Sequence, residues 1–279
     1  MGKNYNIGKV IIAGAGPGDP ELITLKTIRF LRKADAVFTD RLVSEEILNR
    51  YVNPAAEIIY VGKQCRHGSS TPQNLINELL VEYALSGKFV VRLKGGDVSI
   101  FSNILDELQE LVKHGISYEI VPGITAASGA AAYSGIPLTA RGYSSAVRIL
   151  TYHRSNTISD SSWKELAQTD DTLVFYMSSE NLDILVSNLL KNNIDHGKLI
   201  AVVEQATTPM QNVTISSFHD YDLQLKGKTF VSPSLLIIGK VVELHDQFAW
   251  LNNDRSGKSY FIPVSNKKII NTKVVQNVG

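Results

Sequence analysis

A glycine-rich turn is the first feature of this sequence whose residue types could support chemistry. The run 13–20 follows an apolar segment at 10–12 and precedes a helical pattern that starts at Glu21. Glycines allow backbone angles closed to other residues and let a ligand approach the main chain. Such a turn at the carboxyl end of a strand is a usual place for a nucleotide-like ligand, although many only join two elements. Pro17 lacks a backbone N–H, which favours a ligand less phosphate-like than a pyrophosphate.

Two further turns repeat this composition later in the chain. The first, Gly95–Asp97, follows the apolar run 89–93, and the second, Pro122–Gly123, opens a helix of small residues. If their strands share one parallel sheet, all three turns converge on one crevice. Taken singly, each is also compatible with a tight turn or with plain helix–sheet packing.

One acidic and one basic side chain follow the next two predicted strands. Asp40 lies close to the spacing, about 20 residues after a glycine turn, at which dinucleotide folds place an acid that binds ribose. A nicotinamide-dependent oxidoreductase therefore stays open as an alternative. Lys63 ends the third strand, where it could face the same crevice or be an ordinary surface charge.

Short β-branched runs and helical patterns alternate along the chain, and this alternation predicts an α/β protein. Strands are expected at 9–13, 36–39, 57–61, 89–93, 117–121, 147–151, 172–177, 199–204, 213–216 and 234–241. Helices are expected at 20–33, 44–51, 72–86, 103–114, 124–133, 162–168, 180–192 and 218–225. Asp19 is expected to cap the first helix.

Two domains are expected, at 1–138 and 139–250, because a turn-rich stretch at 135–142 separates two runs of alternating elements. The tail at 251–279 is rich in Asn, Lys and Ser and is expected to be loosely docked or disordered.

Composition excludes several classes of protein. With 279 residues, a 44% hydrophobic fraction and a formal net charge of +1, the chain can build real cores but shows no bulk attraction to nucleic acid or membranes. One cysteine rules out a disulfide framework within the chain, and the scattered histidines predict no metal site. Neither a signal peptide nor a membrane span is expected, and a reducing cytoplasm fits.

Seven segments share their order and spacing with one known family. They are GAGPGDPELITLK (14–26), ADAVFTDRLVS (34–44), VGK (61–63), VVRLKGGD (90–97), VPGITAASGAAAYSGIPLT (121–139), TLVFYM (172–177) and SPSLLIIGKVV (232–242). Together they resemble the tetrapyrrole methyltransferases, the class III S-adenosylmethionine-dependent enzymes, over about Gly8 to Trp250. Within that family, the members that methylate uroporphyrinogen III are the most similar.

The resemblance implies the tetrapyrrole methylase fold, in which two α/β domains flank a ligand trough that holds S-adenosylmethionine and releases S-adenosylhomocysteine. The cofactor contacts that it implies are Pro17, Gly95, Gly96, Asp97, Ile100, Thr125, Ala126, Met177 and Ala206. It also implies that Asp40 accepts a proton and that Lys63 donates one.

The activity implied is methylation of uroporphyrinogen III at C2 and C7, which gives precorrin-2 for sirohaem or cobalamin, by a cytoplasmic homodimer. No dehydrogenase or chelatase activity is expected, because the sequence has no third nucleotide-binding unit. The carboxylates of the substrate need cations, and the candidates are Arg41, Arg66, Lys94, Arg141, Arg148 and Arg154.

The sequence departs from the family pattern on the substrate side. The departures include Val98-Ser99, Ser102–Ile104, Ala140, Tyr152 and Asn212. They leave open a methyltransferase that acts on a later precorrin or cobalt-precorrin intermediate. They also leave open a member that has lost catalysis and serves as a binding module.

Overall fold

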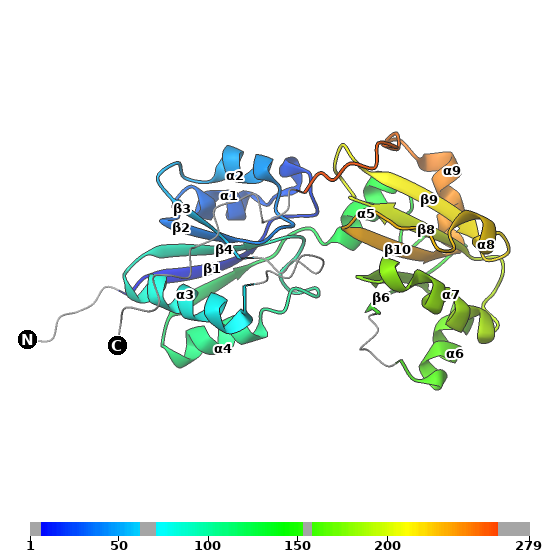
Figure 1. Ribbon diagram of the computed structural model, residues 1–279, viewed down its shortest axis with the longest axis horizontal. Helices are drawn as coiled ribbons and strands as arrows, with labels where there is room; N and C mark the ends of the chain where they lie inside the picture. Colours follow the sequence, from blue (N-terminus) through cyan, green and yellow to red (C-terminus); the bar gives the residue numbers. More distant parts are fainter. Residues whose placement is uncertain (1–6, 62–70, 153–157, 262–279) are drawn as a thin grey trace, which may run out of the picture. The chain divides into compact units, whose positions relative to one another are not determined.

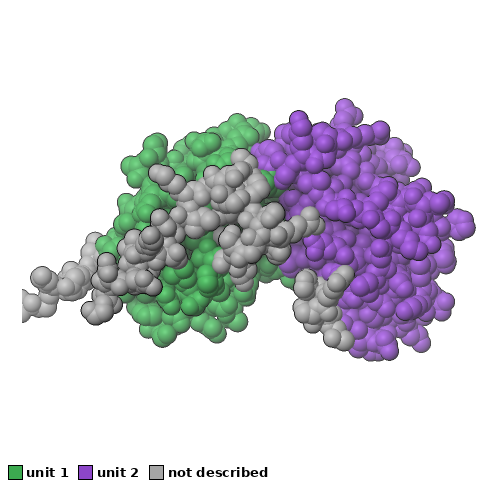
Figure 2. All heavy atoms as spheres, viewed as in Figure 1, with its two compact units in different colours: residues 1–125, 261–279 green, residues 126–260 purple. Residues whose placement is uncertain are grey.

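The computed structural model of the chain (Figure 1) describes residues 7–61, 71–152 and 158–261 of the 279. It divides into two compact units, which Figure 2 distinguishes by colour. In the described part of the chain, the first unit contains the residues up to Thr125 together with Phe261, and the second contains Ala126–Tyr260. The expected domain boundary between residues 138 and 139 stays a prediction.

The first unit is built on a parallel sheet, as the alternation of elements predicts. Its strands are β1 (Lys9–Gly14), β2 (Ala36–Thr39), β3 (Glu57–Tyr60), β4 (Phe89–Lys94) and β5 (Ser117–Val121). They lie in the order β3-β2-β4-β1-β5, and every neighbouring pair is parallel. The carboxyl ends of β1, β4 and β5 therefore meet at one edge of the sheet.

Helices cover both faces of this sheet (Figure 1). On one face lie α1 (Leu25–Leu31) and α2 (Glu45–Tyr51), and on the other lie α3 (Gln73–Leu85) and α4 (Leu105–Lys113). Because successive side chains of a strand point to opposite faces, Ile11 is buried under α1 and α2 while Ile12 is buried under α3 and α4. The chain thus leaves β1 and the adjacent β4 toward opposite faces, and open α/β sheets bind ligands at such points.

The first predicted helix is interrupted. Instead of one helix over 20–33, the chain forms a 3-10 turn, η1 (Pro20–Leu22), and then α1. Thr24 is extended between them, and its hydroxyl accepts the N–H of Thr27 at 3.2 Å, so it caps the start of α1. Asp19 caps η1, as expected from the sequence.

The second unit contains a mixed sheet in the order β6-β7-β10-β8-β9. Its strands are β6 (Val147–Thr151), β7 (Thr172–Tyr176), β8 (Leu199–Glu204), β9 (Asn212–Ser217) and β10 (Ser234–Gly239). Both β7 and β8 pair antiparallel with β10, which lies between them. They are therefore parallel to each other, and their carboxyl ends lie at the same edge of the sheet.

Short helices complete the second unit. They are α5 (Ala126–Ser134), α6 (Asp160–Gln168), η2 (Ser179–Asn181), α7 (Leu182–Lys191), α8 (Tyr221–Gln224), η3 (Lys240–Leu244) and α9 (His245–Phe248). One core forms between the sheet and α6, α7 and α8, and another forms between the sheet, α5 and η3. Among the residues that the structure describes, no helix is long and apolar enough to cross a membrane.

The described part of the tail is tied to the second unit by hydrogen bonds. The Asn253 side chain exchanges hydrogen bonds with the main chain of Val213, at 2.8 and 3.0 Å. The Gln205 side chain donates to the carbonyl of Lys258 at 2.8 Å and accepts the N–H of Tyr260 at 2.7 Å. The expectation of a loosely docked or disordered tail extends to residues 262–279, which lie outside the described residues.

Glu119 on the edge strand β5 provides a pH-dependent contact in the first unit. Lys26 and Lys9 donate to its two carboxylate oxygens at 2.6 and 2.8 Å and lower the pKa of Glu119 from 4.5 to about 2. A lowered folded-state pKa stabilises the fold above pH 4.5, and this stabilisation disappears as the pH falls toward 2. We expect Glu119→Gln to unfold more easily than the parent at neutral pH and equally at the lowest pH, as measured by urea unfolding. A stability difference that does not change with pH would contradict this account.

Candidate functional site

Three turns meet at the carboxyl edge of the first sheet. They follow β1, β4 and β5, as the sequence analysis expects. The N–H of Gly16 donates to the carbonyl of Gly96 at 3.1 Å, and the N–H of Gly96 donates to the carbonyl of Gly16 at 2.7 Å. The N–H of Gly123 donates to the Asp97 carboxylate at 2.8 Å. The turn after β4 is thus bonded to both of the other turns.

Only glycine fits where these segments cross. A Cβ atom on Gly14 would lie 2.6 Å from the carbonyl oxygen of Gly96, and one on Gly123 would lie 2.2 Å from the same oxygen. Both distances are far below a van der Waals contact, and the obstructing atom belongs to the main chain. Gly96 itself has φ 68°, which favours glycine as well. The three main chains therefore pack directly against one another at this crossing.

Asp97 connects two of the turns through its carboxylate. One oxygen accepts the N–H of Gly123, and the other accepts the N–H of Ser99 at 2.8 Å and its hydroxyl. Burial raises the pKa of Asp97, but the hydrogen bonds from Ser99, Gly123 and Val98 outweigh burial and hold the pKa below its ordinary value of 3.8. The carboxylate is therefore ionised at neutral pH and holds the loop after β4 in place.

Strained backbone marks the same sheet edges. Among the described residues other than glycine, six have φ between 47° and 67°. Phe101 and Asn103 lie in the connection from β4 to α4, whereas Met177, Gln205 and Thr207 follow β7 and β8. Asn193, the sixth, follows α7, where the left-handed conformation is common. Such strain gathers at functional sites, so five of the six positions point to the edges at which the cofactor residues are predicted.

The structure brings Asp40 to this region of the first unit. Asp40 directly follows β2, and the pairing of Thr39 with Leu93 places it beside Lys94 at the end of β4. Its carboxylate accepts the N–H of Leu42 at 3.0 Å. Leu42 packs against Gly95 so closely that a Cβ atom on Gly95 would lie 2.8 Å from the Leu42 side chain. Lys63, the second predicted catalytic residue, lies outside the described residues.

Most of the predicted cofactor residues lie in the first unit. Pro17 is buried in the turn after β1, and Ile100 is half-buried in the connection after β4. Thr125, also half-buried, ends the first unit. With Gly95, Gly96 and Asp97, these residues belong to the three turns and the segments that continue them.

The other three predicted cofactor residues belong to the second unit. Met177 and Ala206 follow β7 and β8, whose carboxyl ends share one sheet edge. Met177 is 58% exposed, which is unusual for a methionine side chain that only supports a core. Ala126 begins α5, and the adjacent N–H of Ala127 donates to the hydroxyl of Tyr176 at 2.7 Å. This bond, which the sequence analysis missed, joins the start of α5 to the end of β7.

Lys94 and Arg148, both expected to bind the substrate, form ion pairs within the protein. Lys94 is buried and donates to Glu107 at 3.1 and 3.2 Å, so it is not directed toward a ligand. Arg148 binds both Asp171 and Glu165. Glu107 lies in the apolar stripe of α4, three residues after Ile104 and four before Leu111, and this spacing could have identified a buried carboxylate.

The structure describes two more of these expected cations. Arg41 is half-buried next to Asp40, and Arg141 is exposed in the second unit. Arg66 and Arg154 lie outside the described residues.

Comparison with known proteins identifies the family. The family model for Tetrapyrrole (Corrin/Porphyrin) Methylases matches residues 9–221. The chain belongs to the tetrapyrrole methylase family. This agrees with the resemblance that the glycine turns and their spacing suggested.

Several known proteins align with most of this chain. Siroheme synthase from Vesicomyosocius okutanii is 40% identical over 262 residues, which are 94% of this chain and 54% of the relative. The structure of uroporphyrin-III C-methyltransferase from Thermus thermophilus, complexed with S-adenyl homocysteine, has a TM-score of 0.70 and 35% identity, and the match covers 85% of this chain and 94% of that one. The structure of cobalt precorrin-4 methyltransferase, a cobalamin biosynthetic enzyme, has a TM-score of 0.74 and 26% identity, over 84% of this chain and 95% of that one.

The chain spans about half the length of the curated relatives that it matches. The solved structures, in contrast, are matched over nearly their whole length, at 95% and 94% of those chains.

The crossing of the turns predicts that a side chain at Gly123 destabilises the fold. Gly123→Ala forces a Cβ atom against the carbonyl of Gly96, and such overpacking typically costs about 1–3 kcal/mol. We expect urea unfolding to show a loss of stability in this range. The control is Gly197→Ala, at an exposed position whose nearest neighbour is the movable end of the Asp195 side chain. Equal stability of the two variants would contradict the crossing.

Proposed function

We propose that this chain transfers methyl groups from S-adenosylmethionine to C2 and C7 of uroporphyrinogen III, giving precorrin-2 in sirohaem or cobalamin biosynthesis. The observation that carries the proposal is the crossing of three glycine turns at Gly96 in a chain of the tetrapyrrole methylase family. Siroheme synthases and a uroporphyrin-III C-methyltransferase bound to S-adenyl homocysteine, among its relatives, support the same reaction.

The three turns have the character of a cofactor site. Glycine lets a ligand such as S-adenosylmethionine approach the main chain closely, because no side chain keeps it at a distance. We propose that Pro17, Gly95, Gly96, Asp97, Ile100 and Thr125 bind it from the first unit. Ala126, Met177 and Ala206 contribute from the second unit.

The cofactor supplies an electrophilic methyl group on a sulfonium when it is bound. Methyl transfer is an in-line displacement, so the protein contributes mainly by positioning the reactants and by electrostatics. The rigid, hydrogen-bonded turns provide such positioning, because Asp97 fixes the loop after β4 to Gly123.

Methylation of a pyrrole carbon leaves the ring cationic, so the ring must then lose a proton. We propose that Asp40 accepts this proton, because its segment packs against Gly95 in the cofactor region. Lys63 is proposed to donate a proton or to steady an anionic group of the substrate. General acid–base assistance of this kind typically contributes about 10²–10⁴-fold.

The methylase is also proposed to act as a cytoplasmic homodimer. In the second unit, a groove of about 540 Å³ is lined by small and apolar residues that include Ala131, Leu138 and Phe248. Phe248 is 52% exposed, and Trp250, whose ring contacts that of Tyr133 at a tilt of 60°, is 62% exposed. Exposed apolar surface of this kind is typical of protein interfaces.

Turnover with an identified product tests the reaction. Purified protein, uroporphyrinogen III and S-adenosylmethionine should give a product that has gained two methyl groups, as measured by mass spectrometry. If uroporphyrinogen III stays unmethylated while a later precorrin is methylated, the proposed substrate is wrong. Tight binding of S-adenosylhomocysteine without turnover of either substrate would instead indicate a binding module.

The role of Asp40 is tested by Asp40→Asn. The asparagine oxygen can still accept the N–H of Leu42, so the turn is retained while the base is lost. We expect kcat to fall by about 10²-fold or more with little change in S-adenosylhomocysteine affinity. Asp222→Asn, on the exposed helix α8, is the control and should behave like the parent. An unchanged kcat in Asp40→Asn would contradict the proposal that Asp40 accepts the proton.

The proposed dimer surface is tested by Phe248→Asp. A charge in an apolar interface is costly, so we expect a shift from dimer to monomer in light scattering after size exclusion. Leu223→Asp places the same charge at a position that is 87% exposed in α8 and should leave the dimer intact. A monomeric parent would contradict the dimer, whereas a dimeric Phe248→Asp variant would place the interface elsewhere.

A further inference from the structure

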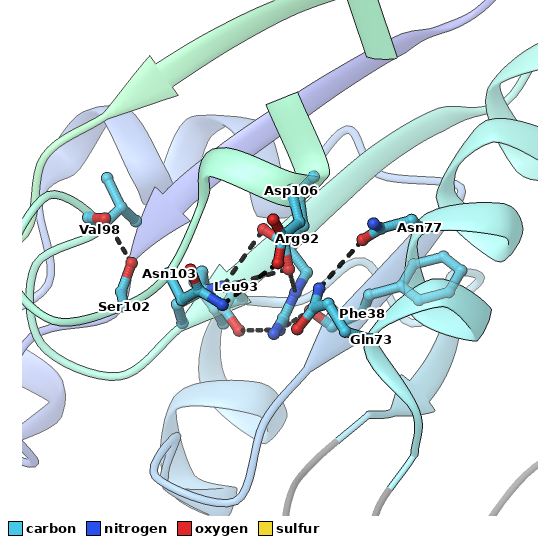
Figure 3. A network of polar contacts seen from close by, with 11 residues as sticks. Phe38, Gln73, Asn77, Arg92, Leu93, Val98, Ser102, Asn103 and Asp106 are labelled. Carbon is cyan, nitrogen blue, oxygen red and sulfur yellow. Dashed lines mark hydrogen bonds and ion pairs between the residues drawn. The ribbon is translucent and has the colours of Figure 1, made fainter. Parts of the chain in front are cut away.

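A charged cluster is buried beneath the connection that follows β4. The Glu107 carboxylate is fully buried, and the side chains of Arg92 and Lys94 are only 5% and 6% exposed. Arg92 donates through Nε to Glu107 at 3.0 Å, and Lys94 donates to both Glu107 oxygens at 3.1 and 3.2 Å. Figure 3 shows Arg92 reaching toward Phe38 and Leu93, whose carbonyl oxygens it binds at 3.3 and 3.1 Å.

Stability alone gives a poor reason for this cluster. Removing charged groups from water is costly, and well-packed apolar residues often stabilise a core equally well or better. The neighbours of the cluster on this face of the sheet, such as Val90, Ile12 and Leu111, are apolar and buried. Burial and the charge of Arg92 lower the pKa of Lys94, although the charges of Glu107 and Asp40 act in the opposite direction. The cluster thus places charged groups in a region where apolar residues alone would stabilise the fold.

The position of the cluster in the chain suggests its purpose. Lys94 is the last residue of β4, and Glu107 lies in the first turn of α4. Their ion pair therefore joins the two ends of the connection 95–104, which carries the predicted cofactor residues Gly95, Gly96, Asp97 and Ile100.

Further bonds hold the connection internally, but they do not fix its base. Ser102 donates to the carbonyl of Val98, and Asn103 donates to Asp106 at 3.4 Å (Figure 3). Phe101 and Asn103 have left-handed backbone angles of φ 51° and 53°. Strained conformations persist only where the surroundings over-determine them, and the Lys94–Glu107 pair supplies this restraint at the base.

Arg92 extends the same restraint to the neighbouring strand. Its bond to the carbonyl of Phe38 reaches β2 two residues before Asp40. Directional hydrogen bonds define both distance and orientation, whereas apolar contacts define them loosely. The cluster is therefore connected to the cofactor loop and to the segment that carries the proposed base.

We propose that Glu107, held by Lys94 and Arg92, is a positioning residue that keeps the connection 95–104 and the end of β2 in the conformation that binds the methyl donor. This proposal rests on the proposed function, because it assigns the connection to cofactor binding. Neither Glu107 nor Arg92 contacts the reacting atoms; both act through the main chain that they hold.

Two variants separate positioning from folding. Glu107→Gln removes the charge but keeps the shape, and it leaves two buried cations unpaired. The triple variant Arg92→Met, Lys94→Met, Glu107→Leu replaces the whole cluster by apolar residues, which restores packing without directional bonds. Glu110→Gln, which affects only the exposed pairs with Lys113 and His114 at the end of the same helix, is the matched control.

Hydrogen exchange of the ligand-free protein is the first measurement. We expect faster exchange in 95–104 in both cluster variants, with the strands of the second unit unchanged, because local opening is distinct from global unfolding. Calorimetric titration with S-adenosylhomocysteine is the second. If the competent conformation falls to about a tenth of the population, the apparent Kd rises about tenfold. Saturating S-adenosylmethionine compensates for a smaller competent population. In the triple variant, kcat should therefore lie closer to the parental value than kcat/KM does.

The outcomes distinguish this inference from the function on which it rests. A triple variant with parental exchange in 95–104 and parental affinity would overturn the positioning role, as would one that fails to fold, because the charges would then serve folding itself. A parent protein that does not bind S-adenosylhomocysteine would defeat the proposed function. Exchange in 95–104 would still report whether the cluster holds the connection.

Discussion

The carbonyl oxygen of Gly96 lies where three segments of the first unit cross, and the candidate site depends on this contact. The oxygen accepts the N–H of Gly16 and leaves no room for a side chain at Gly14 or Gly123. Because β1 lies between β4 and β5, their turns can meet only if all three main chains approach without Cβ atoms. The crossing thus holds the three main chains together at the edge where an open parallel sheet binds its ligand.

Polar groups then fix this surface. The ionised Asp97 links the loop after β4 to the turn after β5, while the buried pair of Lys94 and Glu107 joins the two ends of the same connection. Phe101 keeps a strained backbone between these anchors. Loops are ordinarily the mobile parts of a fold. The connection 95–104 is instead held at several points, so it is suited to bind a ligand without first changing its conformation.

Alternation of apolar runs and helical patterns predicted the strands of both sheets close to their observed bounds, because buried strands carry a strong local signal. The break before Thr24 was not predicted, since a capping hydroxyl there outweighs the continuing helical pattern. The burial of Lys94 in an ion pair was also not predicted. Its partner, Glu107, lies on a different element, and a sequence does not show which charges meet inside a core. The left-handed angle at Met177 likewise has no local signal.

A crystal structure of the protein with S-adenosylhomocysteine would test the central claim most directly. The account predicts ligand density against the main chain of Gly95, Gly96 and Asp97, with Thr125 in contact and the crossing at Gly123 unchanged. Density for the ligand at a surface remote from these three turns, or a crossing that opens to admit it, would contradict the account.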